Sequence, residues 1–219
     1  KEAVLEYLLT IANSDYEMWR SENPQADRNS FNFSLKHMSK AGALFDLAKL
    51  TDISKTYIST LSAEEVYERV HDWAENYNPD FLQLLDSNPK YALSIFSIER
   101  GNEKPRKDIS KWEEVPEYIE YFYKKPTALE FPENLTKEDV LQIIEEYKKV
   151  YDKNETQEEW FPKVREMSEN LGYAKAPKIY KKNPDDYKGH VGDVSTVIRI
   201  AVTGRRNTPD LYQIMQVLG

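Results

Sequence analysis

The hydrophobic residues near the end of the chain repeat with the spacing of an α-helix. Four of them fall at positions i, i+3, i+4 and i+7 and so share one face: Val194, Val197, Ile198 and Ala201. Asp193 precedes this stripe and has the residue type of an N-cap, while Gly204 follows it and has the type that ends a helix. The pattern predicts a helix that begins after Asp193 and stops at Gly204.

A second helix is predicted directly afterwards. Thr208 has the residue type of an N-cap, and Pro209 suits the first helical position. The apolar residues that follow again have helical spacing: Leu211, Ile214, Met215 and Leu218. The two helices then meet at a short turn with four polar side chains in or beside it: Arg199, Arg205, Arg206 and Asn207.

Polar start signals mark three more helices. Residues 62–65 and 156–159 have the Ser/Thr-x-x-Glu spacing of a capping box, and residues 136–139 open a further apolar stripe. After the second box the helix is expected to run to about Leu171, with a restart at Pro162. The chain has seven glycines and few alternating Val, Ile and Thr runs. We therefore expect an all-α protein.

The charge of the chain is acidic overall but uneven. The formal net charge is −8 at pH 7, whereas a simple nucleic-acid binder is expected to be basic. Residues 175–206, however, hold eight basic residues against three acidic ones. Such a local basic face can bind phosphate, and ordinary solvated lysines are the alternative. Within it, residues 175–190 carry Tyr180 and Tyr187 among lysines, which is typical either of an RNA-binding stripe or of a solvated loop.

Several classes of chemistry are disfavoured by composition. The chain has no Cys, and its three His residues lack metal-ligand spacing, so neither a disulfide nor a metal site is expected. No acid–base carboxylate pair and no Gly-x-Ser-x-Gly motif is visible, so no catalytic residue is predicted. No apolar run approaches the roughly 18 residues of a membrane span. Lys1 opens directly into helical pattern, so no secretory signal is visible, and the absence of Cys fits a cytoplasmic protein. The missing first Met is best explained by a fragment or a trimmed tag.

The turn between the two last helices carries a specific sequence motif. Residues 199–204 read Arg-Ile-Ala-Val-Thr-Gly, and residues 208–212 read Thr-Pro-Asp-Leu-Tyr. Together they resemble the Arg-x-Ala-[Val/Leu]-Thr-Gly and [Thr/Ser]-Pro-x-Leu-[Tyr/Phe] segments of bacterial glutamyl-tRNA synthetases. In that family these segments belong to the C-terminal anticodon-binding region.

Other segments extend the resemblance over most of the chain. Residues 2–9 are similar to the helix that follows the family's catalytic signature loop. Ser39-Lys40 and residues 45–50 match its Ser-Lys…Phe-Asp-x-x-Lys-Leu pattern. Residues 104–109 resemble the Arg-x-[Lys/Phe]-[Thr/Asp]-Leu turn of its first anticodon-binding helical domain, whereas residues 60–100 agree only in helical pattern.

The resemblance implies a three-part organisation. Residues 1–60 would form a helical stem-contact segment, and residues 61–128 a first small helical anticodon-binding domain. Residues 129–219 would form a second one, truncated at its C-terminus because family members continue into a further basic segment.

Eight residues are candidate tRNA contacts: Arg106, Arg199, Arg205, Arg206, Thr208, Pro209, Leu211 and Tyr212. By resemblance, Arg106 would read the third anticodon base through two hydrogen bonds. The alternatives are an ion pair with Asp108, or a shift of the role to Lys104 or Lys107.

Arg199 corresponds to the family's second anticodon-contacting arginine. The alternative is a cation that complements the negative end of a helix dipole. Thr208, Pro209, Leu211 and Tyr212 correspond to a helix start that packs against an anticodon base, and a plain core role is the alternative for Leu211 and Tyr212.

The resemblance implies a class I enzyme that joins glutamate to its tRNA with ATP and magnesium. This part would bind the anticodon arm of tRNA(Glu) beside the catalytic domain of the same parent chain. It would itself catalyse no reaction, hold no cofactor, and bind neither DNA nor a membrane. Residues 38–42 resemble the Lys-Met-Ser-Lys-Ser loop with which the family binds the nucleotide. However, His37 stands in place of the first Lys, and the sequence has no His-x-Gly-His motif to accompany the loop. We therefore interpret these residues as a structural turn and not as a nucleotide site. The competing hypothesis is a non-catalytic helical protein-interaction module that binds no RNA, which the acidic net charge favours.

Overall fold

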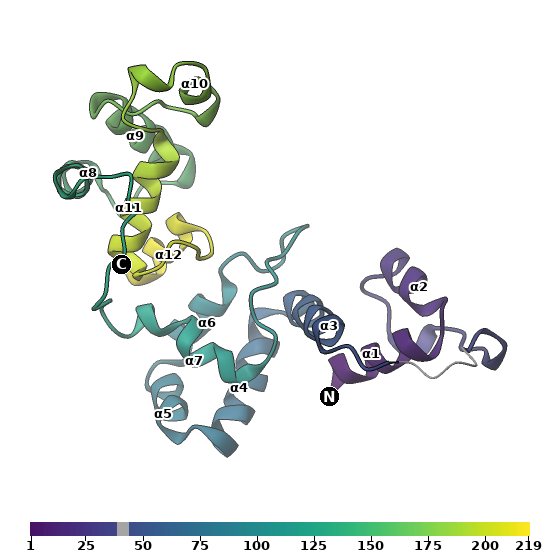
Figure 1. Ribbon diagram of the computed structural model, residues 1–219. Helices are drawn as coiled ribbons and strands as arrows, with labels where there is room; N and C mark the ends of the chain where they lie inside the picture. Colours follow the sequence, from purple (N-terminus) through teal and green to yellow (C-terminus); the bar gives the residue numbers. More distant parts are fainter. Residues whose placement is uncertain (39–43) are drawn as a thin grey trace. The chain divides into compact units, whose positions relative to one another are not determined.

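The computed structural model describes residues 1–38 and 44–219, and within these ranges every regular element is a helix. The all-α prediction is therefore confirmed. The prediction for Ser39-Lys40 and the adjoining loop lies outside the described residues. The chain forms two compact units, Lys1–Tyr118 and Ile119–Gly219, which are described one at a time (Figure 1). The predicted division at residues 60 and 128 stays a prediction.

The first unit begins with three helices: α1 (Glu2–Ala12), α2 (Tyr16–Glu22) and α3 (Leu47–Thr60). α1 packs along α3, and two short 3-10 turns, η1 (Arg28–Ser30) and η2 (Leu35–His37), lie between α2 and α3 in sequence. Asp46 starts α3, since its carboxylate accepts a hydrogen bond from the Lys49 backbone N–H at 3.0 Å. The buried Tyr7 hydroxyl accepts one from the Asp46 N–H at 2.6 Å, which ties this start to α1.

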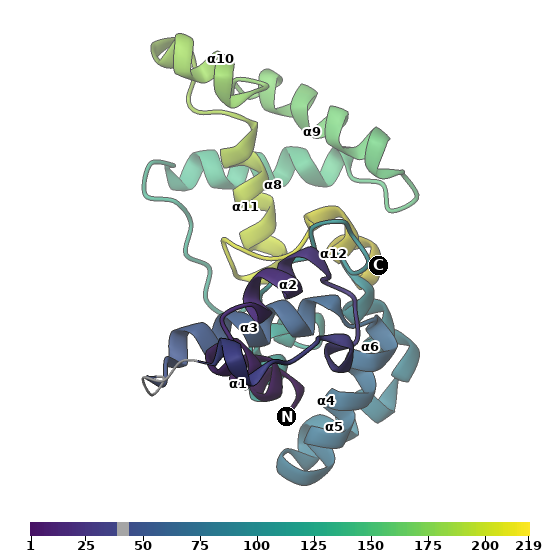
Figure 2. The ribbon, with the colours of Figure 1, turned by 90° about the vertical axis from the view of Figure 1, so that its right-hand side faces the viewer.

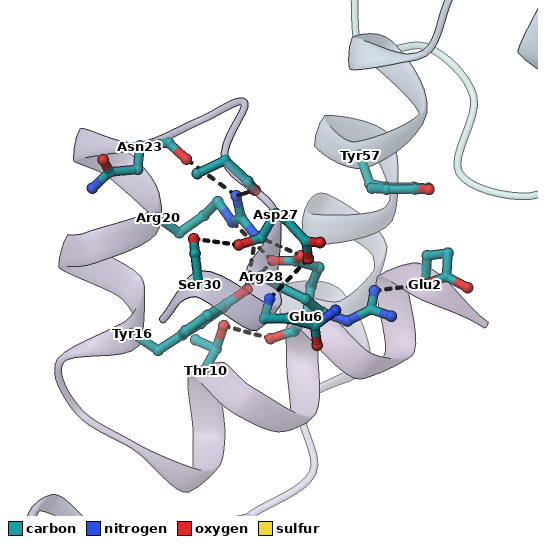
Figure 3. Close-up of polar contacts among 12 residues, drawn as sticks. Glu2, Glu6, Thr10, Tyr16, Arg20, Asn23, Asp27, Arg28, Ser30 and Tyr57 are labelled. Carbon is teal, nitrogen blue, oxygen red and sulfur yellow. Dashed lines mark hydrogen bonds and ion pairs between the residues drawn. The ribbon is translucent and has the colours of Figure 1, made fainter. Parts of the chain in front are cut away.

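A polar network centred on Arg20 joins α1, α2 and the loop after α2 (Figure 3). The guanidinium bonds both carboxylate oxygens of Glu6, at 2.8 and 3.0 Å, and the backbone carbonyl of Ala26 at 2.6 Å. The fully buried Tyr16 donates its hydroxyl to the same carboxylate at 2.5 Å. Burial raises the pKa of Tyr16 to about 12. The charges beside this small core are thus paired within it.

The rest of the first unit is built on α4 (Ala63–Tyr77), which packs against α5 (Pro79–Ser87) and α6 (Pro89–Ser97). The predicted capping box at its start is confirmed: the Ser62 hydroxyl accepts from the Glu65 N–H, and Glu65 accepts from the Ser62 N–H at 2.8 Å. α5 and α6 each begin with Pro directly after an Asn cap, Asn78 or Asn88. The unit closes with η3 (Trp112–Glu114) and α7 (Val115–Tyr118).

The second unit is organised around α11 (Val191–Thr203), which packs against α8 (Lys137–Val150) and α9 (Gln157–Asn170) (Figure 2). Its other elements are η4 (Glu120–Phe122), α10 (Pro177–Lys182), η5 (Pro184–Asp186) and α12 (Leu211–Leu218). The predicted apolar stripe fills the core, because Val194, Val197 and Ile198 are all buried. At its side, the Trp160 indole N–H donates to the Tyr147 hydroxyl at 2.9 Å.

Pro162 does not restart a helix as the sequence had suggested. α9 is continuous from Gln157 to Asn170 with Pro162 inside it. Proline cannot donate to the carbonyl four residues earlier, that of Glu158, but this residue is exposed and water can serve its carbonyl. Burial of Trp160 and Val164 on the core holds the helix together on both sides of the proline. Among the described helices, none is long and apolar enough to cross a membrane.

Candidate nucleic-acid interface

The N-cap of α11 lies three residues before the predicted one, and the helix itself starts at Val191. His190 is the N-cap, and its Nδ1 accepts a hydrogen bond from the Gly192 N–H at 3.0 Å. Asp193 is instead the third helical residue, whose carboxylate accepts from the His190 N–H at 2.8 Å. The prediction that Asp193 is the cap was wrong because its carboxylate closes a capping box from inside the helix. The extra turn buries Val191.

α11 ends where the sequence predicted. Gly204 follows Thr203 with φ of 73°, a left-handed backbone conformation that favours glycine. A Cβ atom at Gly204 would also lie 2.9 Å from the Cβ of Pro126. The turn of residues 204–210, called here the α11–α12 turn, therefore leaves the helix in a direction that only glycine accommodates.

Arg199 reaches from α11 across this turn. Its Nη1 donates to the backbone carbonyls of Pro209, at 2.6 Å, and Thr208, at 3.3 Å, and also to the Thr208 hydroxyl. Thr208 and Pro209 are buried, and Arg199 is half-buried. One guanidinium thus bonds two consecutive carbonyls of the turn, of which that of Pro209 also accepts from the Thr208 hydroxyl at 3.0 Å, and this makes Arg199 a brace of the turn.

Thr208 and Pro209 consequently do not begin the second helix, contrary to the prediction. α12 starts at Leu211, and Asp210 is its N-cap, with a carboxylate that accepts from the Gln213 N–H at 2.9 Å. The Thr208 hydroxyl is occupied by Arg199 and by the Pro209 carbonyl and caps nothing. Asp210 stands one residue before the apolar stripe, so a cap signal was present in the sequence but was passed over for Thr208.

Leu211 and Tyr212 pack within the second unit. Leu211 is 2 % exposed in the core of the second unit. The Tyr212 hydroxyl donates to the Glu155 carbonyl at 2.6 Å, and its ring lies against Trp160 with centroids 5.8 Å apart. The core alternative for these two residues is therefore realised in the fold.

The two arginines of the turn bind the segment that precedes α8. The Arg205 guanidinium lies over the Tyr121 ring, 5.6 Å from its centroid. Arg206 donates to the backbone carbonyls of Phe131 at 3.0 Å and Glu130 at 3.3 Å. Arg206 is exposed and Arg205 half-buried, so both present charge at the surface while their position is fixed.

Arg106 lies in the first unit, in a segment without regular secondary structure. Its Nε and Nη2 donate to the two carboxylate oxygens of Asp108 at 2.7 and 3.0 Å, and Tyr118 donates its hydroxyl to Asp108 at 2.8 Å. The hydrogen bond with Asp108 raises the pKa of Arg106. The ion pair that the sequence left as an alternative is thus formed, and it fixes the plane of the guanidinium. Lys104 and Lys107 are exposed.

The candidate residues are therefore divided. Arg199, Thr208 and Pro209 meet in one cluster, and Arg205 and Arg206 flank it, all in the second unit. Arg106 stands in the first unit with its own partner. Within residues 1–38 and 44–219, no group of three or more His, Asp or Glu side chains is arranged to hold a metal ion.

Comparisons with known proteins cover the whole chain. A sequence model of the anticodon binding domain family matches residues 65–219. The glutamate–tRNA ligase of Acetivibrio thermocellus is 47% identical over 219 residues, which are 99% of this chain and 40% of that protein. The corresponding ligase of Clostridium perfringens strain 13 is 46% identical over 224 residues, and that of Sorangium cellulosum is 39% identical over 219. They align with 100% and 98% of this chain, respectively.

The chain spans about 40% of the length of these ligases. Among solved structures, a crystal structure of a glutamate tRNA ligase from Elizabethkingia meningosepticum in complex with its amino acid aligns with 85% of this chain and 32% of its own. That alignment has a TM-score of 0.49 and 17% identity, so the fold described above stands on the chain's own helices.

Proposed function

The chain belongs to the anticodon binding domain family, and on that premise we propose that it recognises the anticodon arm of tRNA(Glu) for a glutamate–tRNA ligase. The ligase would be a cytoplasmic class I enzyme that uses ATP and magnesium in a catalytic domain elsewhere in the parent chain. This part would select the tRNA without taking part in the chemistry. Identity of 39 to 47% to three such ligases over nearly the whole chain supports the assignment.

The observation that carries the proposal is the braced α11–α12 turn. RNA-binding proteins read unstacked loop bases with side chains held in a fixed position. Here Arg199 bonds the two consecutive carbonyls of Thr208 and Pro209, so the turn is ordered before RNA arrives. A preordered turn loses less conformational entropy on binding. Arg205 and Arg206 then offer positive charge to the RNA from fixed positions.

In this proposal the eight candidate residues have two kinds of role. Thr208, Pro209 and Leu211 are buried and shape the turn against which an anticodon base would pack. Arg199 holds this shape, and a direct contact between its guanidinium and RNA remains the further prediction from the family motif. Tyr212 supports α12 through its bond to the Glu155 carbonyl.

Arg106 is proposed to read the third anticodon base. Asp108 orients the guanidinium through two hydrogen bonds, which suits a side chain that must present a fixed plane to a base. Tyr118 holds Asp108 in turn, so the orientation depends on a chain of two hydrogen-bonded side chains.

Binding of tRNA to the 219-residue chain tests the proposal. A labelled tRNA(Glu) transcript is titrated at several salt concentrations, and steep salt dependence with a preference for the glutamate anticodon is expected. The control is the same transcript with the third anticodon base exchanged. Absence of binding even at low salt would instead support the helical protein-interaction module.

A further inference from the structure

We propose that the lysine face of α10 is a second RNA-binding surface, which takes the phosphate backbone and not the bases. The inference rests on the proposed function and extends it to residues that the anticodon motif does not include. The surface consists of Lys178, Lys181 and Lys182, and is called here the α10 lysine face.

The segment that contains α10, residues 175–189, is called here the α10 excursion, and hydrogen bonds join its two ends. Ala174 donates its N–H to the Gly189 carbonyl at 2.9 Å, and its own carbonyl accepts from the Val191 N–H at 2.8 Å. The Lys188 N–H donates to the Gly172 carbonyl at 3.0 Å. Residues 175–189 therefore leave the core between α9 and α11 and return to it at a hydrogen-bonded base.

Five lysines of this excursion divide into two groups. Lys175 and Lys188 are engaged with neighbouring helices, in ion pairs of 3.3 Å with Glu169 and 2.8 Å with Asp139. Lys178, Lys181 and Lys182 are exposed, and no ion pair to them occurs among residues 1–38 and 44–219. The first two lysines fasten the excursion, while the other three are available to a ligand.

The three available lysines lie on one side of α10, because their spacing is i, i+3 and i+4. Like charges at these positions repel each other and destabilise a helix. The half-buried Ile179 and Tyr180 fall on the opposite side. The Tyr180 ring makes an edge contact with the His190 ring, and the two ring centroids are 5.7 Å apart. The apolar side therefore fastens α10 to the start of α11 and leaves the lysine face outward.

The chemistry of the face selects a polyanion. Lysine is a compact point charge that binds phosphate but reads no base pattern. Asp185 and Asp186 follow in η5, so residues 175–190 hold five lysines against two aspartates in a chain of net charge −8. A membrane surface is disfavoured, because an interfacial helix must expose apolar side chains and those of α10 are turned inward. The location within residues 65–219, the part matched by the anticodon binding domain family, favours RNA.

The test compares two triple variants of the 219-residue chain. One is Lys178→Gln, Lys181→Gln and Lys182→Gln. The control is Lys137→Gln, Lys148→Gln and Lys153→Gln, which changes the net charge equally at exposed lysines of the same unit. Circular dichroism verifies that both keep their helical content. Affinity for tRNA(Glu) is then measured between about 50 and 200 mM salt.

The α10 variant is expected to lower the slope of log affinity against log salt by about 2 to 3, and to weaken binding near 0.1 M salt by about one to two orders of magnitude. The preference between the normal and the exchanged anticodon base should stay as in the wild type, since phosphate contacts carry no base information. The control variant should change the slope by less than about 1.

The outcomes separate the inference from the proposed function. If the wild type binds the tRNA with anticodon preference and the α10 variant matches the control, the α10 lysine face is not an RNA surface although the proposed function stands. If the wild type shows no tRNA binding, both fail. Sedimentation with anionic phosphatidylserine vesicles covers the membrane alternative: loss of vesicle binding in the α10 variant with an unchanged RNA slope would overturn the inference.

Discussion

Replacement of Arg199 by alanine should destabilise the second unit by about 2–4 kcal/mol. The wild-type guanidinium bonds the Pro209 carbonyl at 2.6 Å, the Thr208 carbonyl at 3.3 Å and the Thr208 hydroxyl. A hydrogen bond to a charged group contributes about 1.5–3 kcal/mol, and an enclosed acceptor without a partner costs about 1–3 kcal/mol. The bond to the Thr208 carbonyl is long, and water can enter the space left by the side chain. The expected loss of stability is therefore smaller than the sum of these contributions.

This magnitude separates the brace from the simpler dipole role. A cation that only complements the end of a helix contributes about 0.3–1 kcal/mol. For a unit of about 100 residues, each kcal/mol shifts the melting temperature by roughly 4–8 °C. Arg199→Ala should therefore lower the melting temperature of the second unit by about 10 °C or more, whereas loss of a dipole partner would shift it by a few degrees.

The assay is urea unfolding followed by circular dichroism, with Thr208→Val and the double variant alongside the single one. Thr208→Val removes one acceptor and should cost about 1 kcal/mol. Because both side chains share a bond, the double variant should lose less than the sum of the single losses. A loss below about 1 kcal/mol for Arg199→Ala, or strict additivity in the double variant, would contradict the brace.

Three further predictions concern other parts of the chain. Arg106→Gln in the full-length ligase should reduce discrimination between glutamate and glutamine tRNAs by about tenfold, given roughly 1–3 kcal/mol for a bidentate base contact; an unchanged kcat/KM ratio would show that the base is read elsewhere. Glu6→Gln should cost about 2–3 kcal/mol in urea unfolding because Arg20 loses its carboxylate partner, and a change below about 0.5 kcal/mol would refute this. Burial raises the pKa values of Tyr16, Tyr147 and Tyr173 to about 12, so these tyrosines ionise at lower pH in the unfolded chain than in the folded one. The free energy of unfolding that they contribute below pH 10 is therefore lost between about pH 10 and 12. Urea midpoints at about pH 9 and 11 and the tyrosinate absorbance test this, and native titration of every tyrosine near pH 10 would contradict it.

Helix starts whose signal is local could be predicted from the sequence. The capping box predicted at Ser62 forms because it needs only groups three residues apart, and the helix predicted at residues 136–139 starts at Lys137 with Thr136 as its cap. The all-α class and the end of α11 at Gly204 follow from similarly local rules of periodicity and backbone conformation. These features depend little on what the rest of the chain does.

Features set by tertiary partners could not be predicted. Thr208 has good cap chemistry, but a guanidinium nine residues earlier occupies its hydroxyl and leaves the cap to Asp210. His190 is an uncommon cap type, and it serves here because Ala174 pairs with its segment from across the excursion. The sequence therefore assigned the wrong local role to Asp193 and Thr208, while the tRNA contacts of the candidate residues stay a prediction.

The two proposed surfaces would separate two kinds of RNA contact within one unit. Residues of the α11–α12 turn are braced by hydrogen bonds to buried carbonyls, which suits recognition of a base whose position must be fixed. The lysines of α10 stand on a fastened helix but keep flexible side chains, which suits phosphates whose position varies little with sequence. In an acidic chain, affinity would then depend on α10 and salt, while selectivity would depend on the turn. Variants of the two surfaces should therefore alter different observables, the salt slope for α10 and the preference between anticodon bases for the turn, and should combine additively in free energy if the surfaces act independently.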